Sequence, residues 1–322
     1  MPGIRSRELP RLILFHVLMG TLILGVWARG PVEAASFSVT DDTGRDIVLE
    51  RPALRIIALY GAYNEILAAM GLGDRLVART KTDNLPPSIL SKPSIGTHMR
   101  PNVELVLALK PDLIIQGGGR RQAMMPVDQL SREGLSVAVF NPTNFSELFG
   151  TIARLGVLTG EPTRAQDLID KMKTRLDEAE SRLAGVSHRP RVFFEVRYPN
   201  LLAAGKHSMV DDVITRAGGS NCVRADKMFV RLNMEALIAA RPEVYVVQKG
   251  AMNPDPGMPG ERSNFRILDA VRKNRVLIVD EQVFSRPGPR SVEAVETLAR
   301  FLYPGLWNED RSEATGRDPD RP

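Results

Sequence analysis

Short apolar runs rich in β-branched residues alternate along this chain with segments whose apolar positions recur every three or four residues. In the first half, strand-like runs lie at residues 55–60, 112–116 and 137–140. In the second half, strand-like runs at 191–196, 243–248 and 275–280 alternate with helical patterns at 209–217, 234–240 and 292–301. Strands that alternate with helices predict βαβ units and mainly parallel sheets. The sequence therefore predicts an α/β fold with two lobes, over residues 37–160 and 190–304.

Between these lobes, the pattern over residues 162–184 predicts one long helix. Its apolar side chains recur mostly in steps of three and four, at Ala165, Leu168, Ile169, Met172, Leu176, Ala179 and Leu183. About 21 helical residues span about 31 Å, the width of a small domain. A flexible linker would be rich in glycine and serine, and this segment is not. We therefore expect one rigid helix to join the lobes.

The two ends of the chain differ from the rest. Three arginines precede an apolar run at residues 12–27, and small residues at a cleavage-like spacing follow it. This pattern is typical of a secretory signal peptide, here residues 1–34. A membrane anchor is the alternative, but the run of about 16 residues is shorter than the roughly 20 that span a bilayer. Residues 308–322 are polar without periodicity, which predicts a disordered tail.

Composition narrows the classes of function. The 322 residues carry 43 Lys and Arg against 38 Asp and Glu, a diffuse net charge of +5 that gives no reason to expect nucleic acid. The single cysteine, Cys222, excludes a disulfide framework and cysteine-based metal sites. It also leaves no lipid-accepting cysteine after the signal, so we expect a soluble periplasmic protein. No HExxH or GxSxG motif is present, and we expect no enzyme.

Residues 100–112 and 231–243 form an internal repeat at a constant offset of 131 positions. In each copy an asparagine is a natural helix N-cap, a glutamate falls in the first turn, and a basic residue followed by proline closes the helix. These glutamates, Glu104 and Glu235, could simply stabilise the helix dipole by about 0.3–1 kcal/mol. Their equivalent positions also suit a partner with two-fold symmetry.

Several motifs together resemble the periplasmic metal-chelate-binding proteins of ABC importers. They are Val39–Val48, Arg55–Leu59, the Asn64-Glu65 helix that ends in Gly71-Leu-Gly73, the two repeat helices, Ala204–Ser208, Asp211-Asp212 and Ala217–Gly219. The resemblance covers about residues 37–304. It implies a ferric siderophore, haem or cobalamin bound between the lobes as transported cargo, with no intrinsic cofactor. It also implies a monomer that delivers this cargo to a permease with its ATPase, with Glu104 and Glu235 docking onto permease arginines.

In such a fold the ligand lies between the lobes, where loops at strand ends meet. The candidate ligand-binding residues in those loops are Tyr60, Tyr63, His98, Met99, Arg100, Arg120, Arg121, Tyr198, Phe229, Arg231 and Arg286. The arginines could bind an anionic chelate or be ordinary surface residues, and the aromatic rings could stack on a flat ligand or belong to the core. His98 is a candidate metal ligand or a solvated loop residue.

The expected function is delivery of an iron chelate, a ferric siderophore or haem, to an importer. Cobalamin is the alternative ligand, although the predicted cleft contains no tryptophan, unlike the sites of many cobalamin binders. A non-transport interaction module using the same fold is a third reading. The sequence does not distinguish among the chelates.

Overall fold

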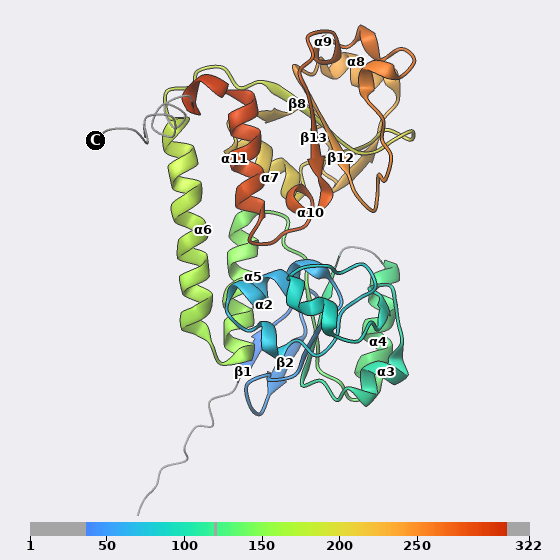
Figure 1. The fold of residues 1–322 in the computed structure, drawn as a ribbon, viewed down its shortest axis with the longest axis vertical. Helices are drawn as coiled ribbons and strands as arrows, with labels where there is room; N and C mark the ends of the chain where they lie inside the picture. Colours follow the sequence, from blue (N-terminus) through green and yellow to red (C-terminus); the bar gives the residue numbers. More distant parts are fainter. Residues whose placement is uncertain (1–36, 119–120, 308–322) are drawn as a thin grey trace, which may run out of the picture. The chain divides into compact units, whose positions relative to one another are not determined.

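Two sheets, one in each half of the chain, organise the fold (Figure 1). The computed structural model describes residues 37–118 and 121–307. The first sheet contains the parallel strands β3 (Ile56–Ala58), β6 (Leu113–Gly117) and β7 (Val137–Phe140), in the order β3-β6-β7. Nearly all residues of these strands are buried, which explains why the strands read as continuous apolar runs.

Helices and short hairpins surround this first sheet. The helices are α2 (Gly61–Ala69), α3 (Val103–Ala108), α4 (Arg121–Arg132) and α5 (Phe145–Thr159). Two antiparallel pairs complete the first half, β1 (Phe37–Thr40) with β2 (Asp46–Leu49) and β4 (Gly96–Thr97) with β5 (Arg100–Pro101). The sequence pattern did not resolve these short hairpins, because two to four residues are too few to show a period.

The second sheet is mixed. Its strand order is β11-β9-β8-β12-β13, with β10 paired to β8, and its strands are β8 (Arg191–Arg197), β9 (Leu202–Ala204), β10 (Ser220–Asn221), β11 (Phe229–Arg231), β12 (Val244–Lys249) and β13 (Val276–Asp280). The pairs of β8 with β10 and with β12, and of β12 with β13, are parallel, whereas β9 and β11 add antiparallel pairs. The helices of this half are α7 (Met209–Arg216), α8 (Met234–Ala240), α9 (Asp269–Arg272), α10 (Glu281–Phe284) and α11 (Ser291–Leu302).

The long connecting helix predicted from periodicity is present as α6 (Pro162–Arg182). It packs against α5 and α11, beside which it runs in Figure 1. Its apolar stripe, from Ala165 to Ala179, is buried. One continuous core contains this stripe together with residues of both halves, including Leu155 and Leu298. The helix is therefore held by packing along its length.

The two copies of the internal repeat are held to their sheets by equivalent hydrogen bonds. Arg55 at the start of the first sheet donates to the carbonyl oxygen of Lys110, with an Nε–O distance of 3.2 Å. Arg191 at the start of the second sheet donates to the carbonyl oxygen of Arg241, with an Nε–O distance of 2.8 Å. Lys110 and Arg241 share a left-handed backbone, with φ of 47° and 46°. Each repeat helix thus ends in the same way and is tied to its own sheet.

Within residues 37–118 and 121–307, no helix has both the length and the apolar character needed to cross a membrane. The predicted signal peptide, residues 1–34, and the predicted disordered tail, residues 308–322, lie outside the described residues. The lobe boundaries given above stay predictions.

Candidate functional site

A cavity of about 430 Å³ is bounded by side chains of both halves. Its volume falls within the range of sites that enclose small ligands, about 300–1,000 Å³. Several residues predicted from sequence line it, namely Tyr60, Tyr63, His98, Met99, Phe229 and Arg286. Residues that the sequence analysis did not select also line it, among them Thr80, Thr82, Asp83, Asn141, Met209, Met252 and Glu281.

His98 and Tyr60 form an edge-to-face pair in this cavity. Their ring centroids are 6.3 Å apart and their planes meet at 71°. Tyr60 is the residue directly before α2, and His98 lies between the short strands β4 and β5. Both are half-buried. An imidazole and a phenol side by side can contact a planar ligand or its metal, because both side chains combine a flat ring with a polar atom.

Gln116 fixes the His98 loop by hydrogen bonds from its side-chain amide. Its fully buried amide nitrogen donates to the carbonyl oxygen of His98 over 2.8 Å and to that of Ala123 over 3.0 Å. Because Gln116 lies within β6, it ties the loop to the sheet and to α4. Among the described residues, no group of three or more His, Cys, Asp or Glu side chains is arranged to hold a metal ion. Metal ligation by His98 stays a prediction.

Tyr63 contributes its ring to the cavity wall but uses its hydroxyl elsewhere. The hydroxyl donates to the carbonyl oxygen of Phe140 over 2.6 Å. Burial raises the pKa of Tyr63 well above its ordinary value. Tyr63 therefore stays a neutral phenol at physiological pH, and its structural bond to β7 favours a packing role over ligation of a metal.

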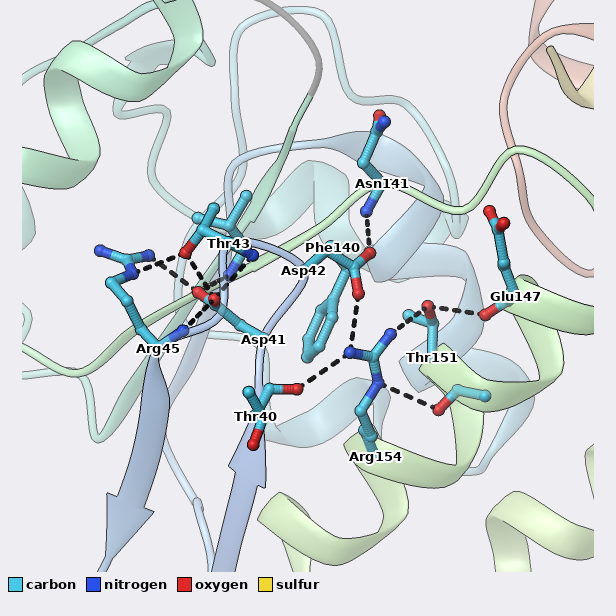
Figure 2. Close-up of polar contacts among 12 residues, drawn as sticks. Thr40, Asp41, Asp42, Thr43, Arg45, Phe140, Asn141, Glu147, Thr151 and Arg154 are labelled. Carbon is cyan, nitrogen blue, oxygen red and sulfur yellow. Dashed lines mark hydrogen bonds and ion pairs between the residues drawn. The ribbon is translucent and has the colours of Figure 1, made fainter. Parts of the chain in front are cut away.

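A polar network fixes the end of β7 behind the cavity (Figure 2). The carboxylate of Asp42 accepts from the backbone N–H of Asn141 over 2.6 Å and pairs with Arg154 at 2.7 Å. The guanidinium of Arg154 lies over the Phe140 ring, 4.6 Å from its centroid. Phe140 and Asn141 both line the cavity. The β1–β2 hairpin thus supports this wall from outside.

Two carboxylates and one guanidinium give the cavity its charge. Asp83 is buried, and its Oδ2 accepts from Asn64 Nδ2 at 3.1 Å and from the Thr80 N–H at 2.9 Å. Glu281 is buried, and its Oε2 accepts from the Met252 N–H at 2.7 Å. Arg286 lies 5.8 Å from the Tyr60 ring centroid. The sequence predicted a cavity lined by several arginines, which are hydrogen-bond donors. The structure instead places two acids, which offer hydrogen-bond acceptors, and one arginine in the lining.

Arg286 and Asp83 approach each other at the start of α2. A Cβ atom on Gly61 would lie 2.8 Å from Oδ1 of Asp83 and 3.1 Å from Nη1 of Arg286. Asp83 belongs to the first half of the chain and Arg286 to the second. The glycine at position 61 leaves room for both charged groups, which lie beside it from the two halves of the chain.

Other predicted ligand-binding residues lie away from the cavity lining. Arg100 and Arg231 are exposed. Tyr198 packs edge-on against Phe265, with ring centroids 5.9 Å apart, and lies beneath the guanidinium of Arg262. Arg120 and the side chain of Arg121 lie outside what the structure describes. The cavity therefore gathers the predicted aromatic residues of the first half and only one of the predicted arginines that the structure describes.

A buried ion pair positions one further wall of the cavity. Arg262 donates through Nη1 and Nη2 to the two carboxylate oxygens of Glu195, over 2.6 and 2.8 Å. Arg262 also donates to the carbonyl oxygen of Pro256 over 2.9 Å. Both side chains of the pair are almost completely buried. The pair anchors the segment 250–262, from which Met252 reaches the cavity. The sequence pattern did not predict this ion pair, because Glu195 lies inside an otherwise apolar strand and Arg262 is 67 positions away.

A larger hollow of about 1040 Å³ lies on the second half alone, near the end of α6 and the starts of β8, β12 and β13. Several of its charged side chains are paired with one another. Glu243 accepts from His188 at 2.8 Å and pairs with Arg191 at 3.2 Å. The cavity shared by both halves is the better candidate site, because ligands in α/β folds bind beyond the carboxyl ends of the strands.

Comparisons with known proteins identify the family and the fold of the chain. A family model described as periplasmic binding protein matches residues 56–297. The uncharacterized ABC transporter substrate-binding lipoprotein YvrC of Bacillus subtilis is 28% identical over 287 residues, 88% of this chain and 90% of that protein. The vitamin B12-binding protein of Yersinia pestis is 27% identical over 252 residues, 78% of this chain and 86% of that protein. The crystal structure of a possible iron-binding (periplasmic solute-binding) protein from Staphylococcus epidermidis matches with a TM-score of 0.68 and 26% identity, covering 79% of this chain and all of that one.

Proposed function

Because the chain belongs to the periplasmic binding protein family, we propose that it is the substrate-binding protein of an ABC importer and that its cargo is an iron chelate, a ferric siderophore or haem. The chelate is transported and is not a cofactor of the protein. The relative YvrC, described as an ABC transporter substrate-binding protein, and the possible iron-binding protein of similar fold support this function.

One observation carries the choice of cargo. The cavity shared by the two halves places the imidazole of His98 edge-on to the phenol ring of Tyr60, next to apolar groups such as Met99 and Phe229. A planar or chelated metal complex matches this lining, because it combines flat apolar surface with a metal that accepts nitrogen or oxygen ligands. Arg286 supplies one cation for an acidic group of the chelate.

Cobalamin is the second candidate, and the two buried acids favour it. Asp83 and Glu281 offer carboxylate oxygens to the cavity, and such oxygens accept hydrogen bonds from amide N–H groups. A corrinoid carries several amides, whereas haem carries two carboxylates that these acids would repel. The relative from Yersinia pestis is described as a vitamin B12-binding protein.

Glu104 and Glu235 are the proposed contacts to the importer's permease, which works together with its ATPase. Both are exposed in the first turns of α3 and α8, the two helices of the internal repeat. Neither lines the cavity. Asn102 and Asn233 cap these helices by accepting from backbone N–H groups at 3.0 and 2.8 Å. The glutamates are therefore not needed as caps, which supports a role at the surface.

The proposal also covers export. A chain without its first 34 residues would be soluble in the periplasm, because its only cysteine is the internal Cys222 and none follows the signal to carry a lipid. The proposed protein acts as a monomer. The relative YvrC is described as a lipoprotein, so the two proteins would differ in attachment to the membrane. Cell fractionation with mass spectrometry of the mature N-terminus tests this part: a lipidated or uncleaved form would contradict it.

Titration calorimetry of the exported protein with haem, cyanocobalamin and the ferric hydroxamate ferrichrome tests the cargo. We expect saturable binding of haem or ferrichrome that His98→Ala weakens at least about tenfold, equal to about 1.4 kcal/mol. His188→Ala is the matched control, since His188 lines the distant hollow. Saturation by cyanocobalamin alone would establish the second candidate. Binding of none of the three would contradict the proposed cargo.

A further inference from the structure

Arg100 and Arg231 occupy equivalent places in the two copies of the repeat, 131 positions apart. Both side chains are exposed. Neither has a carboxylate within ion-pair distance among the residues that the structure describes. Other arginines of the chain, such as Arg175, Arg216 and Arg290, are paired with acids. Two matched, unpaired guanidinium groups at the surface are available to a partner.

The local structure around the two arginines is the same. Each ends or begins a short strand, Arg100 in β5 and Arg231 in β11. Two residues later an asparagine caps a helix, and the glutamate proposed for docking follows in the first turn. The fold therefore repeats the order arginine, cap, glutamate on both halves. Packing does not require an exposed arginine at either position. Its presence in both copies of the repeat therefore suggests that one partner contacts both copies together.

Along the chain, each arginine comes between a residue that lines the cavity and its glutamate. Met99, directly before Arg100, lines the cavity, and so does Phe229, two residues before Arg231. Each arginine and its glutamate are four positions apart in sequence, so their Cα atoms are at most about 14 Å apart. Each half thus presents one cation and one anion on neighbouring stretches of chain, and the cation is closer in sequence to a residue that lines the cavity.

We propose that Arg100 and Arg231 are part of the docking surface and pair with two acidic side chains of the permease. This inference rests on the proposed function, since it extends the surface around Glu104 and Glu235. For each half, the permease would present one acidic and one basic side chain next to each other. The acid would pair with the arginine and the base with the glutamate. The guanidinium group suits this role because it binds a carboxylate through two parallel hydrogen bonds.

A surface with both charges would fix the orientation of the partner as well as attract it. Two glutamates alone would accept any pair of cations at the right spacing. An adjacent arginine repels a partner that presents only cations, and thereby excludes wrong partners and shifted registers. Since both halves carry the same order of charges, the matching partner surface is two-fold symmetric.

Binding to membranes tests the proposal. The probes are spheroplast membranes that contain the importer and protein-free vesicles made from the same extracted lipids. The labelled protein is compared with R100E/R231E, with E104R/E235R, and with the control R132E/R300E, which reverses one exposed arginine on each half outside the repeat. We expect R100E/R231E to weaken binding to importer membranes at least about tenfold. We expect the control to bind like the wild type.

The outcomes separate this inference from the function on which it rests. Normal membrane binding by R100E/R231E, with loss in E104R/E235R, would overturn the inference and leave the glutamate docking intact. Saturable binding of the wild type to protein-free vesicles, lost in R100E/R231E, would assign the arginines to lipid instead. Loss of cargo affinity in R100E/R231E would assign them to the ligand, as the sequence predicts. Absence of wild-type binding to importer membranes would overturn both proposals.

Discussion

Glu65 of α2 and Arg290 at the start of α11 form a two-point ion pair, with an Nε–Oε2 distance of 2.6 Å and an Nη2–Oε1 distance of 3.0 Å. The residues are 225 positions apart in sequence. Neighbours of each, Tyr63 and Arg286, line the cavity. This pair therefore joins the two walls of the candidate site directly, in addition to the packing along α6.

Replacing Glu65 with glutamine should weaken this connection. The ion pair is mostly shielded from solvent, with side-chain exposures of 27% for Arg290 and 12% for Glu65. Its loss should lower the free energy of unfolding by about 1–2 kcal/mol, between the values for surface and buried pairs. Urea denaturation measures this change. Glu293→Gln, an exposed glutamate of α11, is the control, and equal effects of the two substitutions would show that the pair contributes nothing.

Replacing Arg262 with leucine should be among the most destabilising single changes. It would leave the carboxylate of Glu195, which is fully buried, without its cation. Breaking such a pair on one side costs about 3–5 kcal/mol. Arg266→Leu is the matched control, because Arg266 is an exposed arginine four residues after Arg262. Chemical denaturation that gave both variants similar stability would contradict a structural role for the pair.

The same variant should affect the cavity. Arg262 anchors the segment from which Met252 lines the site. The double variant E195Q/R262L removes both charges and should recover part of the lost stability, because no uncompensated buried charge remains. We expect the affinity for the cargo to stay weakened in the double variant, because Arg262 no longer holds the segment that carries Met252. Affinity that recovered together with stability would contradict this role of Arg262. Calorimetry on both variants makes this comparison.

Gly205→Ala tests a close approach of two backbone segments. A Cβ atom at this position would lie 2.2 Å from the carbonyl oxygen of Lys227 and 2.9 Å from that of Ala225. Because these are backbone atoms, the chain must shift, and overpacking of this kind costs about 1–3 kcal/mol. Gly185→Ala has open space around the new Cβ and should change stability by less than about 0.5 kcal/mol. Equal melting temperatures for the two variants would contradict the predicted clash.

Asp41 makes stability depend on pH. Burial alone would raise the pKa of Asp41, but hydrogen bonds from Thr43 and Arg45 outweigh this effect and hold it below the ordinary value (Figure 2). The ionised carboxylate also accepts from the Val139 N–H at 3.1 Å, which ties the first hairpin to β7. A lowered folded-state pKa stabilises the fold above the unfolded value of about 3.9, and this contribution disappears as pH falls through the folded value.

Asp41→Asn should therefore destabilise the protein at pH 7, by about 1–3 kcal/mol for the weakened hydrogen bonds of a charged group. The difference from the wild type should shrink as pH falls below about 3.9, because Asp41 becomes protonated first in the unfolded chain and then, at lower pH, in the folded protein. Unfolding curves at several pH values measure this trend. Asp46→Asn, an exposed residue of the same hairpin, is the control. A difference that stays constant with pH would show that the charge of Asp41 is not the cause.

Local periodicity determined most secondary structure in advance. The apolar positions from Ala165 to Ala179 recur mostly every three or four residues, and that pattern alone predicts an amphipathic helix with this one stripe packed against the core. The strands β6, β7 and β12 were readable because they are buried on both faces and thus continuously apolar. The repeat around Asn102 and Asn233 was equally visible, since helix caps depend on neighbouring residues only.

The tertiary structure alone decided which residues share the cavity. Asp83 and Met252 come from separate loops, and Glu281 begins α10. No sequence pattern brings these residues together, because the position of each segment depends on the sheet order and on the crossovers between strands. The same holds for Tyr198, which lies under Arg262 instead of facing the cavity. Sequence identifies residues able to bind a ligand, while the packing of distant segments decides which of them meet, since a contact across many residues depends on every element between them.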